Sequence, residues 1–202
     1  MWKRLLVTSL AFATCSLGSL ACAEAPQKEA TKPAAKSEPA KDAKPAAPPA
    51  PAPLRARAEV KSADGKKLGV VTFEQLAHGV LVAGELAELP PGGHAFHVHE
   101  VGKCEPPFQT AGGHFNHAQK KHGMRATDGA HAGDLPNLFA NEAGKVKFEV
   151  VAHDVSLKEG PGYLFDADGS ALVLHATVDD YRTDPAGNAG GRIACGVVTL
   201  DK

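Results

Sequence analysis

The chain has 202 residues, a formal net charge of −1 and ten histidines. A charge this close to zero gives no electrostatic reason to expect a nucleic acid or an acidic membrane as partner. An aromatic content of 5%, with 21 glycines and 15 prolines, favours turn-rich β structure over a helical bundle.

The amino terminus predicts a secretory signal peptide over residues 1–23. Two basic residues precede the apolar stretch Leu5–Ala21, which ends in small residues. A retained transmembrane helix is the weaker alternative, because serines and threonines interrupt a stretch already marginal for spanning a bilayer. Cleavage after Ala23 and lipidation of Cys22 both stay open. We therefore expect export to the periplasm or cell envelope, with or without a membrane tether.

Residues 24–53 are rich in proline, alanine and lysine, contain no aromatic residue, and have Thr31 as their one β-branched residue. Such a composition cannot bury enough apolar surface to offset the entropy of ordering, so a disordered linker is predicted. The first 53 residues carry a net charge of +3 and residues 54–202 carry −4. The globular domain is expected to span residues 54–202.

Short apolar or alternating runs separated by glycine and proline predict an all-β, antiparallel sandwich or barrel. Asp64-Gly65 predicts a hairpin turn, and Pro90–Gly93 predicts a break in the chain. Two long intervals, Glu100–Gly133 and Ala176–Gly191, are of a length that usually carries function. The predicted strands are Arg55–Lys61, Leu68–Phe73, Val80–Leu86, Phe96–His99, Val146–Val151, Ala171–His175 and Ala194–Leu200, with Leu135–Ala140 as a weaker eighth.

Histidines are concentrated in one stretch, where seven of the ten lie between positions 94 and 137. Imidazole is a ligand that suits both copper and zinc. Period-two alternation places His97 and His99 on one face of a strand, about 7 Å apart, so both can reach one ion. His114, His122, His131 and Asp134 follow at offsets of fifteen, eight, nine and three residues. The stretch therefore predicts a metal site.

Six motifs occur along the chain in a familiar order: HAFHVHEVGKC, AGGHFN, HG, HAGDLPN, LVLH and GNAGGRIACGVV. Over residues 55–202 the chain resembles Cu/Zn superoxide dismutase, and in particular the bacterial secreted branch. The resemblance implies a Greek-key antiparallel β-sandwich or flattened barrel of about eight strands. It also implies an oxidoreductase that converts superoxide to oxygen and hydrogen peroxide by redox cycling of copper, beside a zinc site.

The resemblance assigns roles to individual residues. The copper ligands would be His97, His99, His114 and His175. The zinc ligands would be His114, His122, His131 and Asp134, so that His114 bridges both ions and later donates a proton. Asp179 would accept hydrogen bonds from His97 and His122, with the adjacent Asp180 as the alternative. Arg192 would attract and hold superoxide.

Cys104 and Cys195 match the cysteines that the resembled family joins in a disulfide. An even pair in an exported protein agrees with that implication, and two free thiols are the alternative. His94 matches a family position that supports the backbone near the copper strands. His117 stands where the family usually has proline, and we favour a neutral replacement over an extra exposed ligand.

Three further points stay open at this stage. The loop after His175 contains no lysine, so Lys103, Lys120 or Lys121 could guide the substrate instead. The competing hypothesis for function is a non-catalytic protein that buffers copper and zinc in the cell envelope. The sequence does not choose between a monomer and a homodimer.

Overall fold

The computed structural model describes residues 52–201. The expected signal peptide, with Cys22 and Ala23, lies outside the described residues, as does the linker up to residue 51. Between residues 52 and 201, no helix is both long enough and apolar enough to cross a membrane.

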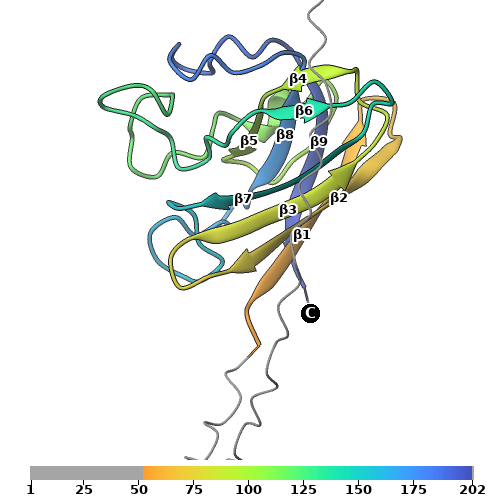
Figure 1. The fold of residues 1–202 in the computed structure, drawn as a ribbon. Coiled ribbons are helices and arrows are strands. Elements are labelled where there is room, and N and C mark those ends of the chain that lie inside the picture. Colours follow the sequence, from red (N-terminus) through yellow and green to blue (C-terminus); the bar gives the residue numbers. More distant parts are fainter. Residues whose placement is uncertain (1–51, 202) are drawn as a thin grey trace, which may run out of the picture. The chain divides into compact units, whose positions relative to one another are not determined.

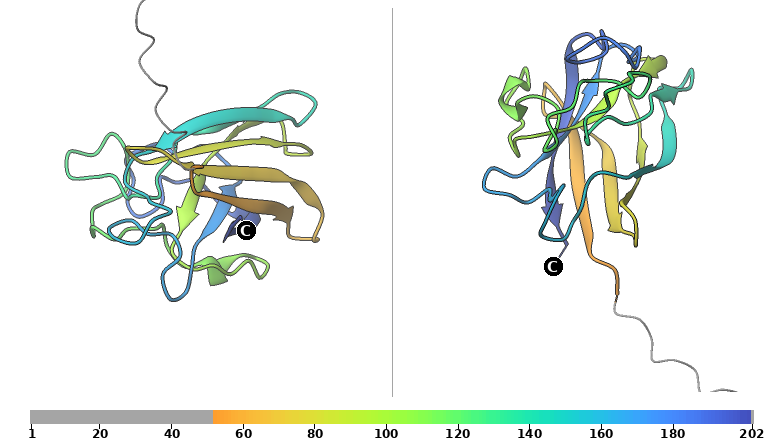
Figure 2. Two further views of the ribbon diagram at one scale, coloured as in Figure 1. Left: turned by 90° about the horizontal axis from the view of Figure 1, so that it is seen from below. Right: turned by 90° about the vertical axis from the view of Figure 1, so that its left-hand side faces the viewer.

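One curled antiparallel sheet of seven strands makes up most of the described domain (Figure 1). Its spatial order is β5-β8-β9-β1-β2-β3-β7, and viewed from below the sheet bends around its own core (Figure 2). The prediction of an all-β fold is confirmed. The bounds are β1 Arg55–Ser62, β2 Lys67–Gln75, β3 Val80–Leu86, β5 Phe96–His99, β7 Val146–Ala152, β8 Ala171–His175 and β9 Arg192–Leu200.

Two short strands and one turn of 3-10 helix complete the elements. β4 (Gly92–His94) pairs with β6 (Leu138–Ala140) in a separate two-stranded sheet, and η1 covers Gln109–Ala111. The predicted break at Pro90–Gly93 is therefore wrong in its last two residues. Gly92 has a φ of +116°, which disrupts any local strand pattern, and β4 forms because β6 pairs with it across the fold.

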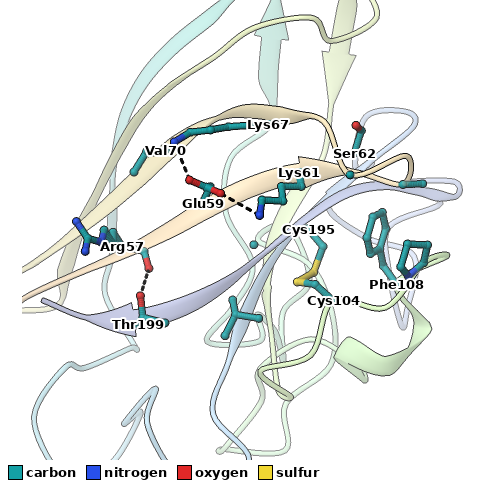
Figure 3. Close-up of a pocket in the computed structure, with 15 residues that line it drawn as sticks. Arg57, Glu59, Lys61, Ser62, Lys67, Val70, Cys104, Phe108, Cys195 and Thr199 are labelled. Carbon is teal, nitrogen blue, oxygen red and sulfur yellow. Dashed lines mark hydrogen bonds and ion pairs between the residues drawn. A yellow bond between two sulfur atoms is a disulfide. The ribbon is translucent and has the colours of Figure 1, made fainter.

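Alternation along β1 explains how the sheet divides core from solvent. Ala56, Ala58 and Val60 are buried, whereas the intervening residues point outward. On the outer face, Glu59 pairs with Lys67 at 2.7 Å and with Lys61 at 3.0 Å (Figure 3). Solvent screens exposed pairs of this kind, so they contribute little to stability, and the buried apolar face is the main stabilising feature of the strand.

β5 and β8 differ from β1 because every one of their residues is buried. Phe96, Leu172 and Leu174 face the main core, whereas Val173 packs in a smaller cluster on the opposite face. The loop between β5 and β6 covers β5 through backbone bonds, including Val98 N–H to the Gly133 carbonyl at 2.9 Å. Polar side chains on these two strands are thereby enclosed on both sides.

The disulfide between Cys104 and Cys195 joins the β5–β6 loop to β9 and closes 91 residues of chain. It lies beside Phe108 on the outer side of the sheet (Figure 3). Phe108, Ala111 and Cys195 belong to the same buried cluster. The bridge therefore holds the start of the long loop against the strand that carries Arg192.

Candidate metal centre

Four imidazoles converge where the long loops meet the sheet. His97 and His99 lie on β5, two residues apart and therefore on one face. His175 ends β8, the strand paired with β5. His114 comes from the β5–β6 loop, where an isolated antiparallel β-bridge pairs its backbone with that of His99. One nitrogen of each ring lies within 4.8 Å of the other three.

The nitrogens that could meet at this centre are buried and have no hydrogen-bond partner. They are His97 Nδ1, His99 Nε2, His114 Nε2 and His175 Nε2. Buried polar atoms without partners are costly and rare in native proteins. A cation that accepts all four lone pairs removes that cost, and a set of imidazole nitrogens suits Cu(II). The residues present therefore fit a copper ion.

In His97 and His99 the ring nitrogen that points away from this centre makes a hydrogen bond, and that bond fixes the tautomer. His97 Nε2–H donates to Asp179 Oδ2 at 2.9 Å, and His99 Nδ1–H donates to the Gly112 carbonyl at 3.1 Å. A neutral imidazole carries one N–H, so each donation leaves the lone pair on the nitrogen that faces the centre.

Burial also lowers the pKa values of three of the rings, those of His99, His114 and His175. It lowers the pKa of His175 to about 3 and holds the pKa of His99 well below that of free imidazole. Burial lowers the pKa of His114 to about 4, although a hydrogen bond to Asp134 opposes the shift. At neutral pH a metal ion would not have to displace protons from these three nitrogens.

A second group adjoins the first and is centred on Asp134. Its Oδ1 atom lies 2.9 Å from His114 Nδ1, 3.1 Å from His122 Nδ1 and 3.4 Å from His131 Nδ1. The Oδ2 atom accepts backbone N–H groups of Gly123 and His131 at 2.9 and 3.0 Å. Three nitrogens and one carboxylate oxygen make an ordinary tetrahedral zinc shell.

The environment keeps Asp134 ionised for this task. Burial acts to raise the pKa of Asp134, but hydrogen bonds from His114, His122 and His131 outweigh it and hold the pKa far below its ordinary value. His114 belongs to both groups, with Nε2 directed to the first and Nδ1 to the second. The two groups therefore share a single ring.

Asp179 connects the groups a second time. Its Oδ2 lies 2.9 Å from His97 Nε2 and its Oδ1 lies 3.0 Å from His122 Nε2, with all three side chains fully buried. Asp180 instead lies on the surface, where it accepts hydrogen bonds from Thr183. Of the two neighbouring carboxylates, Asp179 is the one in contact with the imidazoles.

Arg192 lines a cavity of about 660 Å³ that opens onto the first group, together with His114 and His175. Its guanidinium donates to the carbonyls of Phe108 at 2.6 Å and Gly112 at 2.7 Å. Both carbonyls belong to the loop that the disulfide anchors. Burial lowers the pKa of Arg192 from its ordinary value, which still leaves a guanidinium charged at neutral pH.

The remaining candidates lie elsewhere. Lys103, Lys120 and Lys121 are exposed and do not line this cavity. His117 is exposed, and its Nε2 lies 3.2 Å from the Asp154 carbonyl, outside both ligand groups.

His94 is buried between two backbone carbonyls. Its Nδ1 lies 2.9 Å from the carbonyl of His175, and its Nε2 lies 2.7 Å from the carbonyl of Pro90. These contacts support the backbone beside β8.

Sequence reasoning missed two residues that surround Asp179, namely Asn137 and Tyr181. Asn137 bonds the backbone of Asp179 through both ends of its amide, and the Tyr181 hydroxyl accepts the backbone N–H of Asn137. Asn137 ends the HAGDLPN motif and could have been noticed there. Tyr181 has no comparable signal in the sequence.

Comparison with known proteins gives consistent matches. The family model for copper/zinc superoxide dismutase (SODC) matches residues 67–198. Superoxide dismutase [Cu-Zn] 1 of Aquifex aeolicus is 48% identical over 148 residues, covering 72% of this chain and 88% of the relative. The Caulobacter vibrioides superoxide dismutase [Cu-Zn] is 48% identical over 147 residues, covering 71% and 84%.

Solved structures agree with this assignment. The crystal structure of a SOD-like protein from Bacillus subtilis superposes with a TM-score of 0.67 at 40% identity, covering 70% of this chain and 96% of that one. Both the identity and the coverage of these relatives are high, and the family match over residues 67–198 includes every residue of the two ligand groups. The chain therefore belongs to the copper/zinc superoxide dismutase family.

Proposed function

We propose that residues 54–202 form a superoxide dismutase domain, which converts two superoxide ions and two protons into oxygen and hydrogen peroxide. The observation that carries this proposal is the single imidazole of His114, which presents one nitrogen to each of two adjacent ligand groups. A site for one metal does not require such a ring.

In this proposal the first group binds copper and the second binds zinc. Copper supplies one-electron redox chemistry there, and zinc, which has none, contributes structure and charge. The copper ligands are His97, His99, His114 and His175. The zinc ligands are His114, His122, His131 and Asp134. Asp179 holds His97 and His122 in the tautomers that leave their ligand nitrogens free.

Arg192 acts on the substrate. Residues 54–202 carry a formal net charge of −4, and superoxide is an anion. A fixed guanidinium at the cavity wall provides a local positive potential, and local fields raise the capture of small ions by about 10–10³-fold. His114 lines the same cavity, and its imidazole is the group from which a proton can reach the reduced substrate.

A non-catalytic metal buffer is the competing function. Storage would need the two ligand groups but would not need a guanidinium held by two carbonyls at the cavity wall. Nor would storage require a disulfide that anchors those carbonyls. These features favour catalysis.

The test measures superoxide consumption by the copper- and zinc-loaded protein and by Arg192→Ala and His114→Ala variants with copper content verified. Arg182→Ala is the matched control, because Arg182 is exposed on the neighbouring loop and does not line the cavity. Loss of turnover in the first two variants alone would support the enzyme. Turnover no greater than that of free copper in the loaded wild type would support buffering.

The proposal extends to export. Residues 1–23 act as a signal peptide and residues 24–53 as a linker, and the product resides in the periplasm or cell envelope. A disulfide in the folded domain suits an oxidising compartment. Mass spectrometry of the mature amino terminus separates cleavage after Ala23 from lipidation of Cys22. All proposed ligands come from one chain, so the chemistry needs no second copy of it.

A further inference from the structure

Tyr181 lies where three segments of the chain meet. Its hydroxyl accepts the backbone N–H of Asn137 at 2.6 Å, its carbonyl accepts the backbone N–H of Arg125 at 3.0 Å, and its own N–H donates to Asp179 Oδ1 at 2.6 Å. These partners belong to the β5–β6 loop, the approach to β6 and the loop between β8 and β9. One residue therefore joins all three.

Asn137 carries the connection on to Asp179. Its Nδ2 donates to the Asp179 carbonyl at 2.9 Å, and its Oδ1 accepts the Asp179 N–H at 2.8 Å. The side-chain amide of Asn137 therefore bonds both the N–H and the carbonyl of Asp179. The backbone N–H of Asn137 in turn donates to the Tyr181 hydroxyl.

The backbone of Tyr181 shows that this arrangement is imposed by its surroundings. Its φ is +61°, a left-handed conformation that bulky residues rarely adopt. Such strain persists where surrounding contacts over-determine it. Two further contacts do so here: the Arg125 guanidinium lies 5.3 Å from the ring centroid, and Gly123 packs so closely on the Tyr181 carbonyl that a Cβ could not fit.

From these contacts we propose that Tyr181 is a positioning residue for the zinc site, acting through Asn137 and Asp179. The inference rests on the proposed function, because it assumes that His122 and its companions bind zinc. Tyr181 belongs to neither ligand group and does not line the cavity, so in this proposal it contacts neither metal nor substrate. Its phenol sets where the Asp179 carboxylate lies, and that carboxylate sets the direction of the His122 ring.

The zinc ligands should depend on this support more than the copper ligands do. His97 and His99 are held by β5 and its pairing with β8. His122 and His131 lie on loop segments, where position depends on side-chain and single backbone contacts. Loss of a partner that orients a metal-binding histidine commonly weakens metal affinity by about 10–100-fold.

The experiment compares zinc affinity of the metal-free, disulfide-bonded wild type, Tyr181→Phe and Tyr163→Phe by chelator competition. Tyr163 is the chain's other tyrosine; it packs on Phe165 at 5.8 Å between β7 and β8, outside both ligand groups. We expect Tyr181→Phe to bind zinc about tenfold more weakly and to change the visible spectrum of cobalt substituted at the site. Tyr163→Phe should match the wild type in both.

A double variant tests the route. If the phenol acts through Asn137, then adding Tyr181→Phe to Asn137→Ala should weaken zinc binding by less than twofold further. A full tenfold further loss would overturn that route, and unchanged affinity and cobalt spectrum in Tyr181→Phe would overturn the inference. Absence of zinc binding by the wild type would instead refute the proposed function. The effect of Tyr181→Phe is measured as a ratio of zinc affinities, once with Asn137 present and once in Asn137→Ala. A loss of stability that is the same in both cases leaves the two ratios equal and is therefore not mistaken for an interaction between the two residues.

Discussion

Replacing Gly187 with alanine should damage the zinc site far more than its position in an irregular loop suggests. Gly187 lies in the loop between β8 and β9 with a φ of +62°. A methyl group there would overlap the Asp179 carboxylate and lie 2.7 Å from His122 Nε2. The carboxylate would have to move, and it is the group that orients both His97 and His122.

Two effects contribute to the expected loss. A non-glycine residue in the left-handed conformation costs about 1–2 kcal/mol. Displacing Asp179 also breaks its hydrogen bond to His122, and hydrogen bonds to charged groups contribute about 1.5–3 kcal/mol each. We therefore expect the free energy of unfolding of the metal-free protein to fall by about 2.5–5 kcal/mol, adding the two ranges. Zinc affinity should fall by about 10–100-fold.

Gly65→Ala is the control that separates strain from overlap. Gly65 has a φ of +84°, and no atom lies within 4 Å of where its Cβ would stand. It should show the conformational cost alone and bind zinc normally. Urea unfolding of the disulfide-bonded, metal-free proteins gives the stability difference, and chelator competition gives the zinc affinity. Equal stability and equal zinc affinity of the two variants would refute the reasoning.

Three further predictions concern charge, protons and the disulfide. Turnover of the loaded enzyme should fall as ionic strength rises, and Arg192→Ala should flatten that dependence, because salt screens the guanidinium's attraction for an anion; parallel salt curves in stopped-flow assays would contradict this. In the metal-free protein burial acts to lower the pKa of His122, but hydrogen bonds to Asp134 and Asp179 raise it to about 9. The proton therefore stabilises the metal-free fold fully below the unfolded pKa of about 6.5, and this stabilisation is lost as pH rises through 9. Zinc affinity should accordingly rise about tenfold per pH unit from 7 to 9, because zinc must displace that one proton. A zinc affinity, measured by calorimetry, that does not change with pH over this range would contradict the prediction. Cys104→Ser should lower the free energy of unfolding by about 4.5 kcal/mol, from the loop-entropy estimate for 91 residues; urea midpoints within error of the wild type would rule this out.

Local pattern was a reliable guide to the strands and to the histidine pair. Alternation in β1 and continuous apolar character in β8 are properties of adjacent residues, and the strands formed where they were expected. His97 and His99 share a face because strand side chains repeat every two residues. The all-β class follows from patterns of this kind.

β4 shows where local pattern failed. Pro90, Pro91 and two glycines indicate a break, and the strand exists because Gly92 pairs with Ala140, about fifty residues later. Pairing between distant segments leaves no trace in the local periodicity of either. The same limit explains why the strand predicted over Leu135–Ala140 is shorter in the structure, where β6 covers only Leu138–Ala140.

The choice between Asp179 and Asp180 illustrates the limit at the metal centre. Adjacent carboxylates are chemically equal in the sequence, yet one is fully buried between two imidazoles and the other bonds Thr183 at the surface. Residue types and spacing were enough to indicate a metal site, since imidazole chemistry belongs to each side chain. Contacts between segments far apart in the chain decide which ring nitrogens have no hydrogen-bond partner. Contacts of the same kind place Tyr181 against Asn137 and Asp179. Such contacts arise when loops pack against the sheet, and no stretch of sequence contains that packing.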